Sequence, residues 1–430
     1  VLAPGESPIG ASAASSSITV QLIESIFERN NLELAYDQVV HSVSRSSCRT
    51  SSPPERKRAR IRNLRAGRAD TIQAIINEYK QNGIPEFSRR VTKIPKLPGG
   101  QCIRPISSFP LSQRVILRST LICVWPLLEE LIVPNISYCT FRKTRALKQS
   151  RGLVAAVSAI SELRAEYNFY AFETDIQRFF DEIDQERLLN ILRPFVKDSD
   201  TMILLQAILE SEPNYDPVYF KDSEILDSTR GVPQGAALSP LLACAYLSPF
   251  DTFMCHTNVR MYRYVDDLVF LGTQDECLEY EILCKSQLKN EFGLSTHEDP
   301  SKTRHVGPTE TLTFLGHDIL PDGTLRPSAK RQARVVQRIF EIVCGFRTQY
   351  GYIHGLPKAN HKDVVEHLTS YLLGYFSSMG HCKWLDSDFA SLALSIGNAL
   401  ESRGLQANRL SKALRSSSQK WPSAFLEALP

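Results

Sequence analysis

The chain has 430 residues, of which 43% are hydrophobic and 23% charged, so most of it should fold into two or three packed subdomains. Its net charge of +3 does not by itself indicate a nucleic-acid-binding protein. Its 10 cysteines include no Cys-x-x-Cys pair, which argues against a zinc site and a disulfide framework. Cysteines that form no disulfide framework are expected to be free thiols in a reducing cytoplasm. No apolar run reaches the length of a transmembrane helix, so we expect no membrane partner.

The N-terminal part is predicted to be mostly helical. Residues 1–17 are rich in Ala, Ser, Gly and Pro without the pattern of a signal peptide, and we interpret them as a flexible or processed leader. Helices are predicted from Ile18 to Glu28 and from Asp70 to Lys80, and the second carries an apolar stripe. The Ser-rich segment from Ser42 to Pro54 is predicted to be a loop.

A basic cluster lies between these two helices. It is accompanied by one acidic residue, Glu55, and consists of Arg56, Lys57, Arg58, Arg60, Arg62, Arg65 and Arg68. Such a cluster can neutralise nucleic-acid phosphates. The alternative is a solvated linker or an ordinary surface helix.

Two central segments carry residues suited to a nucleotide site. Asn168 to Asp175 is an apolar, aromatic run that predicts a strand ending on a carboxylate, and a helical stretch follows to Leu192. Taken alone, Asp175 would be interpreted as a helix N-cap. The segment from Ser228 to Pro240 contains Gly231 and Gly235, which predict a tight loop before a helix that offers free N–H groups to a phosphate or a base pair. An ordinary loop before a buried helix is the alternative.

The segment from Met261 to Leu271 predicts a β-hairpin with Asp266 and Asp267 at its tip. Carboxylates are the oxygen ligands that Mg²⁺ prefers, and a two-metal site needs carboxylates from different strands. Asp175 and Asp266 can meet that need. Without a second acidic strand, the same pair of aspartates would be a solvated turn.

The C-terminal part is predicted to be helical after Arg326-Pro327. Val335, Val336, Ile339, Phe340 and Val343 make one apolar face. Basic residues are interleaved with them, and we expect this helix to follow a nucleic-acid duplex through Lys330, Arg331, Arg334 and Arg338.

Together these segments resemble reverse transcriptases of the bacterial group II intron and retron kind, over about residues 90 to 320. The three central palm motifs are matched by the Asp175 strand, the Gly231 loop and the turn Tyr264-Val265-Asp266-Asp267. The other matching blocks are Lys93-Ile94-Pro95-Lys96 through Arg104-Pro105-Ile106, Tyr138 to Arg142, Gly293-Leu294 with Lys302-Thr303, and Phe314-Leu315-Gly316, which resembles the primer-grip hairpin.

The chain also departs from these families. Cys244 stands where group II enzymes usually have Asn, and neither the Asn-Ala-x-x-His nor the Val-Thr-Gly block of retron enzymes is present. No endonuclease region follows. The resemblance is therefore to stand-alone bacterial reverse transcriptases, many of which serve in phage defence.

The resemblance implies an α+β fold with the right-hand architecture of polymerases. Residues 18–165 would form an N-terminal extension and helical fingers, and 166–325 an antiparallel-sheet, RRM-like palm from which 198–230 returns to the fingers. Residues 326–430 would form a helical thumb.

The resemblance also implies the roles of single residues. Asp175, Asp266 and the backbone of Ile176 would hold two Mg²⁺ ions, with Mn²⁺ as a possible substitute, and Asp267 would support them electrostatically. Lys93, Lys96 and Arg104 would contact the triphosphate, Gln234 and Gly235 the nascent base pair, and Lys302 the pyrophosphate as a proton donor. Phe180 matches the position of a ring that excludes a 2′-hydroxyl; without the resemblance it would be a core residue.

The implied function is RNA-directed DNA synthesis from dNTPs. We expect a structured non-coding RNA as template or scaffold and a cDNA product that acts in antiphage defence. One alternative is a template-independent or protein-primed DNA polymerase of a defence system. A second is an RNA-binding, maturase-like protein with an inactive palm.

Overall fold

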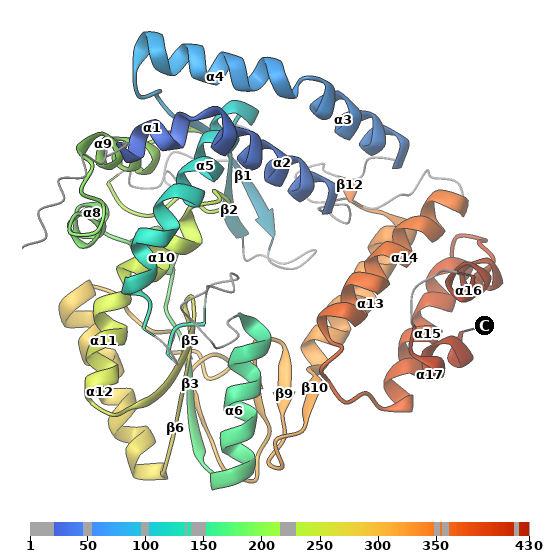
Figure 1. Ribbon diagram of the computed structural model, residues 1–430. Helices are drawn as coiled ribbons and strands as arrows, with labels where there is room; N and C mark the ends of the chain where they lie inside the picture. The colour runs from blue at the N-terminus through green and yellow to red at the C-terminus, as the bar shows by residue number, and fades with distance from the viewer. Residues whose placement is uncertain are drawn as a thin grey trace, which may run out of the picture.

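The computed structural model describes residues 21–45, 54–95, 103–133, 136–138, 152–215, 229–347, 353–354, 361–416 and 421–429 (Figure 1). The predicted mixed α+β class is confirmed, because separate small sheets lie between helical regions. The leader and Lys96 lie outside the described residues.

Helices form the N-terminal region. They are α1 (Leu22–Phe27), α2 (Arg29–Arg45), α3 (Pro54–Ala66), α4 (Arg68–Asn82) and α5 (Leu111–Leu128), with a 3-10 turn at Glu129–Leu131. The predicted stripe of α4 packs inward: Ile72 and Ile75 are buried, and Tyr79 stacks on Phe27 with ring centroids 3.9 Å apart. The loop predicted from Ser42 is wrong at its start, because α2 continues to Arg45.

The sequence-based statement about membrane-length segments is also wrong. The helical stretch Leu111–Leu131 has 21 residues and is apolar enough to cross a membrane by length and composition. A core helix meets the same criteria, and the buried residues of α5 include Val115, Ile116 and Leu117 in the largest apolar cluster. The polar side chain of Ser119 on this helix is satisfied internally, since its hydroxyl donates to the Ile26 carbonyl at 2.6 Å.

A three-stranded sheet adjoins these helices. Its order is β2-β1-β4, formed by β1 (Ser88–Pro95), β2 (Ile103–Ser108) and β4 (Glu212–Tyr215). The β1–β2 pair is antiparallel, whereas β4 runs parallel to β1 and arrives from more than 100 residues later in the chain. Arg89 joins the three strands, because its guanidinium donates to the Ser211 carbonyl and to the Ser107 hydroxyl.

The central sheet is antiparallel and has the order β5-β6-β3-β7. Its strands are β3 (Tyr170–Asp175), β5 (Arg260–Tyr264), β6 (Asp267–Gly272) and β7 (Arg304–Val306). Alternate residues serve opposite faces of a strand. Phe172, Leu268 and Phe270 belong to the apolar cluster that includes α12 (Gln274–Phe292), and Ala171, Val269 and Leu271 to the one that includes α6 (Leu153–Tyr167). Both faces of β3 and β6 are therefore buried.

Short helices connect the strands of the two sheets. They are α7 (Phe179–Glu182), α8 (Gln185–Leu192), α9 (Ser199–Leu209), α10 (Ser239–Tyr246) and α11 (Ser248–His256). The helix predicted after the Gly loop is α10, where Leu241, Leu242, Ala245 and Tyr246 are buried.

The C-terminal region is attached through a third small sheet. That sheet has the order β10-β9-β8, with β8 (Leu312–Phe314), β9 (His317–Ile319) and β10 (Leu325–Pro327). Five helices and a two-stranded pair follow: α13 (Ala329–Cys344), β11 (Phe346–Arg347), β12 (Ile353–His354), α14 (His361–Ser378), α15 (Asp386–Glu401), α16 (Ala407–Arg415) and α17 (Ser423–Ala428). These helices share an apolar cluster of their own. A buried arginine of α6, Arg164, supports the chain before β8 by donating to the carbonyls of Gly307, Pro308 and Glu310.

Candidate catalytic site

The strand register brings the predicted carboxylates together. Asp175, the last residue of β3, lies opposite Asp267, the first residue of β6. The Ile176 N–H donates to the Asp266 carbonyl at 3.0 Å, which joins the end of β3 to the hairpin turn. The helix-cap alternative for Asp175 is excluded, because the next helix begins at Phe179 with Arg178 before it.

The hairpin turn contains a strained residue. Val265 has a φ of +61°, in the left-handed region that β-branched residues rarely adopt. Such a conformation costs on the order of 1–3 kcal/mol and persists only where its surroundings impose it. Here the Arg263 guanidinium donates to the Val265 carbonyl at 2.9 Å, which holds the turn that carries Asp266.

Arg263 is itself held by a buried ion pair. Its side chain is 0% exposed and that of Asp251, on α11, is 1% exposed. The Nε atom donates to Asp251 Oδ1 at 2.7 Å, a second nitrogen pairs with Oδ2, and the same guanidinium donates to the Ser137 hydroxyl at 3.3 Å. Burial raises the pKa of Asp251, and the bidentate pair with Arg263 opposes that shift. Removing either partner would leave an uncompensated buried charge.

Negative charge accumulates around the turn. Burial, followed by the charges of Asp266, Asp175 and Glu173, raises the pKa of Asp267 to about 8. Burial also raises the pKa of Glu173, although the Arg304 guanidinium lies 2.9 Å from its carboxylate. The carboxyl groups therefore oppose one another's ionisation.

Two cationic or polar side chains approach Asp175 from the segment after α12. The Lys302 ammonium lies 2.8 Å from Oδ2, and the His297 Nε2 atom lies 3.2 Å from Oδ1. The histidine is not aligned to donate, so the buried Oδ1 atom accepts no hydrogen bond within the described residues. Lys302 was expected beside the pyrophosphate, and in this structure its ammonium neutralises Asp175.

These residues fit a divalent cation. Mg²⁺ and Mn²⁺ prefer carboxylate oxygen, and the buried Oδ1 atom of Asp175 is a ligand atom without a hydrogen-bond donor. Burial is the main cause of the raised pKa of Asp267, and a cation at this place would relieve the carboxylate repulsion that adds to it.

The glycine loop lies between the two sheets. Gly235 has a φ of +109°, and a Cβ atom there would come within 2.7 Å of the Ser107 carbonyl of β2. The Ser107 N–H donates to the Gln234 carbonyl at 2.7 Å, and the Gln234 side chain donates to Asp181 at 2.8 Å. Only glycine allows this approach, so the loop is fixed against the neighbouring sheet.

Phe180 borders a small pocket on this loop. The pocket is lined by Arg89, Pro105, Ser107, Phe180, Asp181, Arg230, Gly231, Val232 and Gln234. Phe180 is half-buried, whereas its neighbour Phe179 is buried beside it with ring centroids 5.7 Å apart. Phe179 therefore packs in the core, whereas Phe180 lines the pocket.

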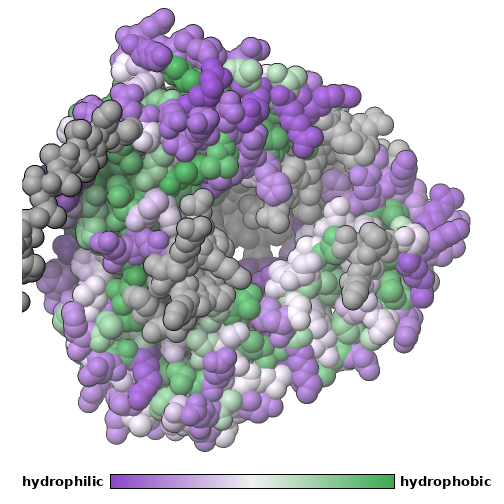
Figure 2. Space-filling model, viewed as in Figure 1, coloured by the Kyte–Doolittle hydropathy of each residue, from purple (hydrophilic) through white to green (hydrophobic). Residues whose placement is uncertain are grey.

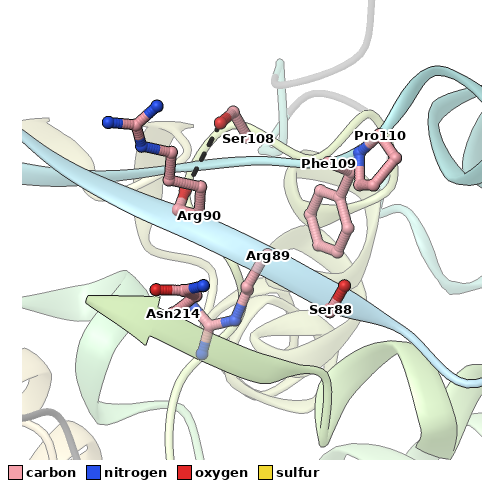
Figure 3. Close-up of a pocket in the computed structure, with 7 residues that line it drawn as sticks. All are labelled: Ser88, Arg89, Arg90, Ser108, Phe109, Pro110 and Asn214. Carbon is pink, nitrogen blue, oxygen red and sulfur yellow. Dashed lines mark hydrogen bonds between the residues drawn. The ribbon is translucent and has the colours of Figure 1, made fainter. Parts of the chain in front are cut away.

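A second, larger pocket lies along the three-stranded sheet (Figure 3). It has a volume of about 650 Å³ and is lined by Ser88, Arg89, Arg90, Ser108, Phe109, Pro110 and Asn214. Arg89 lines both pockets, and burial lowers its pKa. The two pockets thus share one guanidinium.

The structure describes the other predicted residues only in part. Lys93 pairs with Pro105 and Arg104 with Ile94 in the β1–β2 ladder, and their side chains, like those of Arg56, Lys57 and Arg58, lie outside the described part. Of the two predicted basic sets, Arg60, Arg62 and Arg65 on α3 and Lys330 and Arg334 on α13 are exposed. Arg331 is half-buried and donates to the Ser378 hydroxyl at 3.2 Å.

Sequence reasoning missed several residues of the site. Glu173 was predictable, because it lies two positions before Asp175 and so on the same face of the strand. His297, Asp251 and Arg89 carried no such local signal; each reaches the site from a separate element.

Comparison with known proteins agrees with this geometry. Residues 94–319 match the family described as reverse transcriptase (RNA-dependent DNA polymerase). Protein YkfC of Escherichia coli is 24% identical over 293 residues, which cover 60% of this chain and 73% of that protein. The COX1/OXI3 intron 2 protein of Saccharomyces cerevisiae is 21% identical over 308 residues, 58% of this chain and 33% of the yeast protein.

Solved structures of telomerase are also similar. Apo telomerase from Candida tropicalis has a TM-score of 0.44 at 13% identity, covering 74% of this chain and 62% of the telomerase chain. Telomerase from Candida albicans, in complex with a fragment of telomeric RNA, has a TM-score of 0.43 at 12% identity, covering 80% and 64%. The chain thus spans under two thirds of these telomerase chains.

Replacing Asp267 with Asn should stabilise the metal-free protein at high pH. The pKa of Asp267 is raised from 3.8 to about 8, so the folded state binds the extra proton between these values and wild-type stability falls as pH rises across that window. At pH 9 in EDTA, we expect the variant to be more stable by at least about 1 kcal/mol, the equivalent of one pKa unit. The gain should shrink towards pH 4. Calorimetry at several pH values, with and without Mg²⁺, tests this, and an equal gain at all pH values would contradict it.

Variants of the Arg263–Asp251 pair should distinguish its effect on the stability of the fold from its effect on the geometry of the metal site. Asp251→Asn or Arg263→Met alone should destabilise the fold by about 3–5 kcal/mol. The double variant Arg263→Met/Asp251→Leu should recover much of that loss while Mn²⁺ affinity, measured by electron paramagnetic resonance, stays roughly tenfold weaker because the Val265 carbonyl has lost its donor. Wild-type Mn²⁺ affinity in the double variant would show that Arg263 does not position the turn.

Proposed function

The chain belongs to the reverse transcriptase (RNA-dependent DNA polymerase) family, and we propose that it copies an RNA template into DNA by two-metal nucleotidyl transfer. The observation that carries this proposal is the group of carboxylates at the end of β3 and the hairpin turn, with one buried Asp175 oxygen open to a cation. Members of this family use a divalent metal, an RNA template and nucleotide substrates. The choice of Mg²⁺ for this chain is part of the proposal.

The proposed architecture is that of a right hand. Residues 18–165 form the N-terminal extension and fingers, 166–325 the palm, and 326–430 the thumb, while 198–230 return to the fingers. The pairing of β4 with β1 supports that return. Figure 2 shows a hollow in one face of the molecule, with hydrophilic side chains over α3 and α4 above it and the C-terminal helices to its right. A primer–template duplex would occupy this hollow.

Each site residue has a proposed task. Asp175, Asp266 and the Ile176 carbonyl hold the two metals, which when bound lower the pKa of the primer hydroxyl and neutralise the leaving pyrophosphate. Asp267 supports Asp175 and Asp266 electrostatically. Lys302, whose ammonium lies 2.8 Å from Asp175, would be the proton donor to the leaving pyrophosphate.

Other residues bind and select the nucleotide. Gln234 and Gly235 lie against the nascent base pair, and Phe180 sits beneath the sugar. Lys93 and Arg104, which belong to the β1–β2 pair, and Lys96 contact the triphosphate. The Arg89–Arg90 pocket beside them would hold the template backbone, since guanidinium groups recognise phosphate.

The proposed partner is a structured non-coding RNA, and the proposed setting is antiphage defence in the cytoplasm. Exposed Arg60 and Arg62 on α3 and Lys330 and Arg334 on α13 give that RNA two basic surfaces. Two alternatives remain open. One is template-independent or protein-primed DNA synthesis, which would use the same carboxylates; the other is a maturase-like RNA-binding role.

Asp175→Ala or Asp266→Ala should abolish nucleotide incorporation on a primed RNA template. Loss of a bridging ligand should lower the rate by about 10³-fold or more, equivalent to several kcal/mol of transition-state stabilisation. Asp275→Ala is the matched control, because Asp275 is an exposed aspartate shortly after β6. Full incorporation in either site variant would refute the assignment.

The RNA partner is tested by sequencing the nucleic acid bound to the wild type and to Asp266→Ala, with and without phage infection. One dominant RNA, with cDNA absent from the variant, supports the proposed partner. Untemplated DNA favours the first alternative.

Phe180→Ala should raise ribonucleotide use relative to deoxynucleotide use. The smaller side chain leaves room for the 2′-hydroxyl, and the ratio of kcat/KM values for the two sugars should shift towards ribonucleotides by about 10-fold or more, equivalent to 1.4 kcal/mol. Phe180→Tyr keeps the ring and should keep the wild-type ratio. An unchanged ratio of kcat/KM values in Phe180→Ala would show that Phe180 is a core residue and does not select the sugar.

A further inference from the structure

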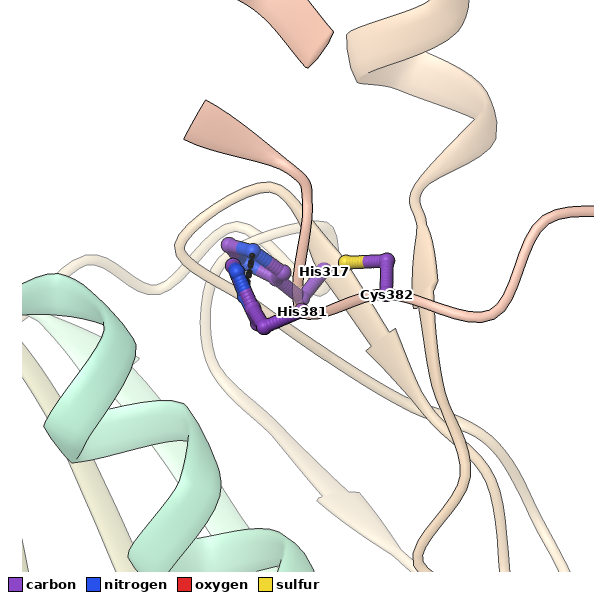
Figure 4. Close-up of side chains that lie close together, drawn as sticks. All are labelled: His317, His381 and Cys382. Carbon is purple, nitrogen blue, oxygen red and sulfur yellow. Dashed lines mark hydrogen bonds between the residues drawn. The ribbon is translucent and has the colours of Figure 1, made fainter. Parts of the chain in front are cut away.

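Two histidines and a cysteine meet on elements other than those that carry the carboxylates. His317 begins β9, and His381 and Cys382 lie in the turn after α14, yet their ligand atoms all lie within 4.8 Å of one another (Figure 4). The sequence-based argument against a zinc site considered closely spaced cysteines. It could not find this cluster, because 64 residues separate the two histidines.

The protonation of His317 leaves one nitrogen for a metal. Its Nδ1 atom lies 3.1 Å from the Leu315 carbonyl, which can only accept, so Nδ1 carries the proton. The Nε2 atom therefore has the lone pair. A backbone carbonyl that orients a histidine in this way is the usual second contact of a metal-binding imidazole. Burial lowers the pKa of His317 to about 4, which keeps the ring neutral at pH 7.

His381 presents its Nε2 atom to the same place. The two Nε2 atoms are 3.0 Å apart. Around a tetrahedral zinc ion, two imidazole nitrogens lie roughly 3.3 Å apart and a nitrogen and a sulfur roughly 3.6 Å apart. The rings need to separate by only a few tenths of an ångström, and a neutral His381 would carry its proton on Nδ1 instead.

Cys382 supplies the softer ligand. It is 9% exposed, and Figure 4 shows its sulfur turned towards the rings. Burial raises the pKa of the thiol to about 11, so a metal must displace its proton. Arg331 lies near all three residues. Burial lowers the pKa of both histidines and the Arg331 charge adds to that effect, whereas at Cys382 the same charge partly offsets the rise that burial causes.

We propose that His317, His381 and Cys382 bind one Zn²⁺ ion. Two neutral imidazoles and one thiolate match the borderline-soft character of zinc, whereas Mg²⁺ prefers oxygen. Zinc with three protein ligands carries water as its fourth. The site is separate from the carboxylates and does not depend on the proposed function.

The zinc ion would join two parts of the chain. His317 belongs to the β8–β9–β10 sheet, and the turn that carries His381 and Cys382 connects α14 to α15. One backbone bond already ties them, since the Lys383 N–H donates to the Leu325 carbonyl at 2.8 Å. Arg331, the first-turn residue of α13, packs over Gly316 in the turn between β8 and β9. A metal here would fix the C-terminal helices to the hairpin that carries Phe314-Leu315-Gly316.

Metal analysis of the 430-residue chain tests the proposal. After incubation with ZnCl₂ and dialysis against buffer containing Mg²⁺, the wild type should retain about one zinc per chain. His381→Ala/Cys382→Ser should retain at least about tenfold less, since two of three ligands are lost. The matched control is Cys255→Ser/His256→Ala, an adjacent and exposed Cys–His pair on α11 that should retain zinc like the wild type. Circular dichroism checks that each variant is folded.

Cobalt substitution gives a readout that folding alone would not change. The wild type with Co²⁺ should show a thiolate-to-metal charge-transfer band, absent from the single variant Cys382→Ser and present in the control pair. Zinc should also raise the wild-type Tm, because an ion that binds only the folded state stabilises it. Wild-type zinc retention no greater than that of His381→Ala/Cys382→Ser, or a charge-transfer band that survives Cys382→Ser, would overturn the proposal.

Discussion

The candidate site depends on one buried ion pair, Arg263 with Asp251. A guanidinium without solvent contact can be retained only when its donors are satisfied, and here they go to Asp251, Ser137 and the Val265 carbonyl. That last bond stabilises a backbone conformation that valine would otherwise avoid. The Arg263–Asp251 pair therefore holds the turn that carries Asp266, so the position of the Asp266 carboxylate depends on the packing of α11.

The burial of the central sheet explains why the turn needs this buried ion pair. Both faces of β3 and β6 are covered by helices, so polar groups can reach solvent only at the strand ends. Asp175 and Asp267 lie opposite each other at one of these ends, with Glu173 on the same face. Burial, and then the charges of the neighbouring carboxylates, raise the pKa of Asp267, so ionisation of Asp267 is disfavoured in the folded protein. The apolar packing of the rest of the sheet offsets the cost of placing these carboxylates together.

Local patterns in the sequence predicted the elements but not the contacts between them. The strand to Asp175, the hairpin at Asp266 and the helix after Gly235 follow from alternation, turn residues and an apolar face. The partners of Arg263, the approach of His297 and the meeting of His317 with His381 depend on how distant segments pack, which no local period encodes. The four residues of β4 are another example: their parallel pairing with β1 could be expected only from the resemblance to known polymerases.

That pairing has a consequence for how the protein is made. On the ribosome, β1 and β2 emerge long before Glu212–Tyr215, so the edge of β1 that pairs with β4 stays unpaired while the more than 100 intervening residues are synthesised. The same delay affects α1, whose Ile23 N–H donates to the Asp198 carboxylate 175 residues later. Contacts this distant in sequence slow folding and prolong the exposure of strand edges. The free edge of β1 is therefore open to non-native strand pairing until β4 has been synthesised.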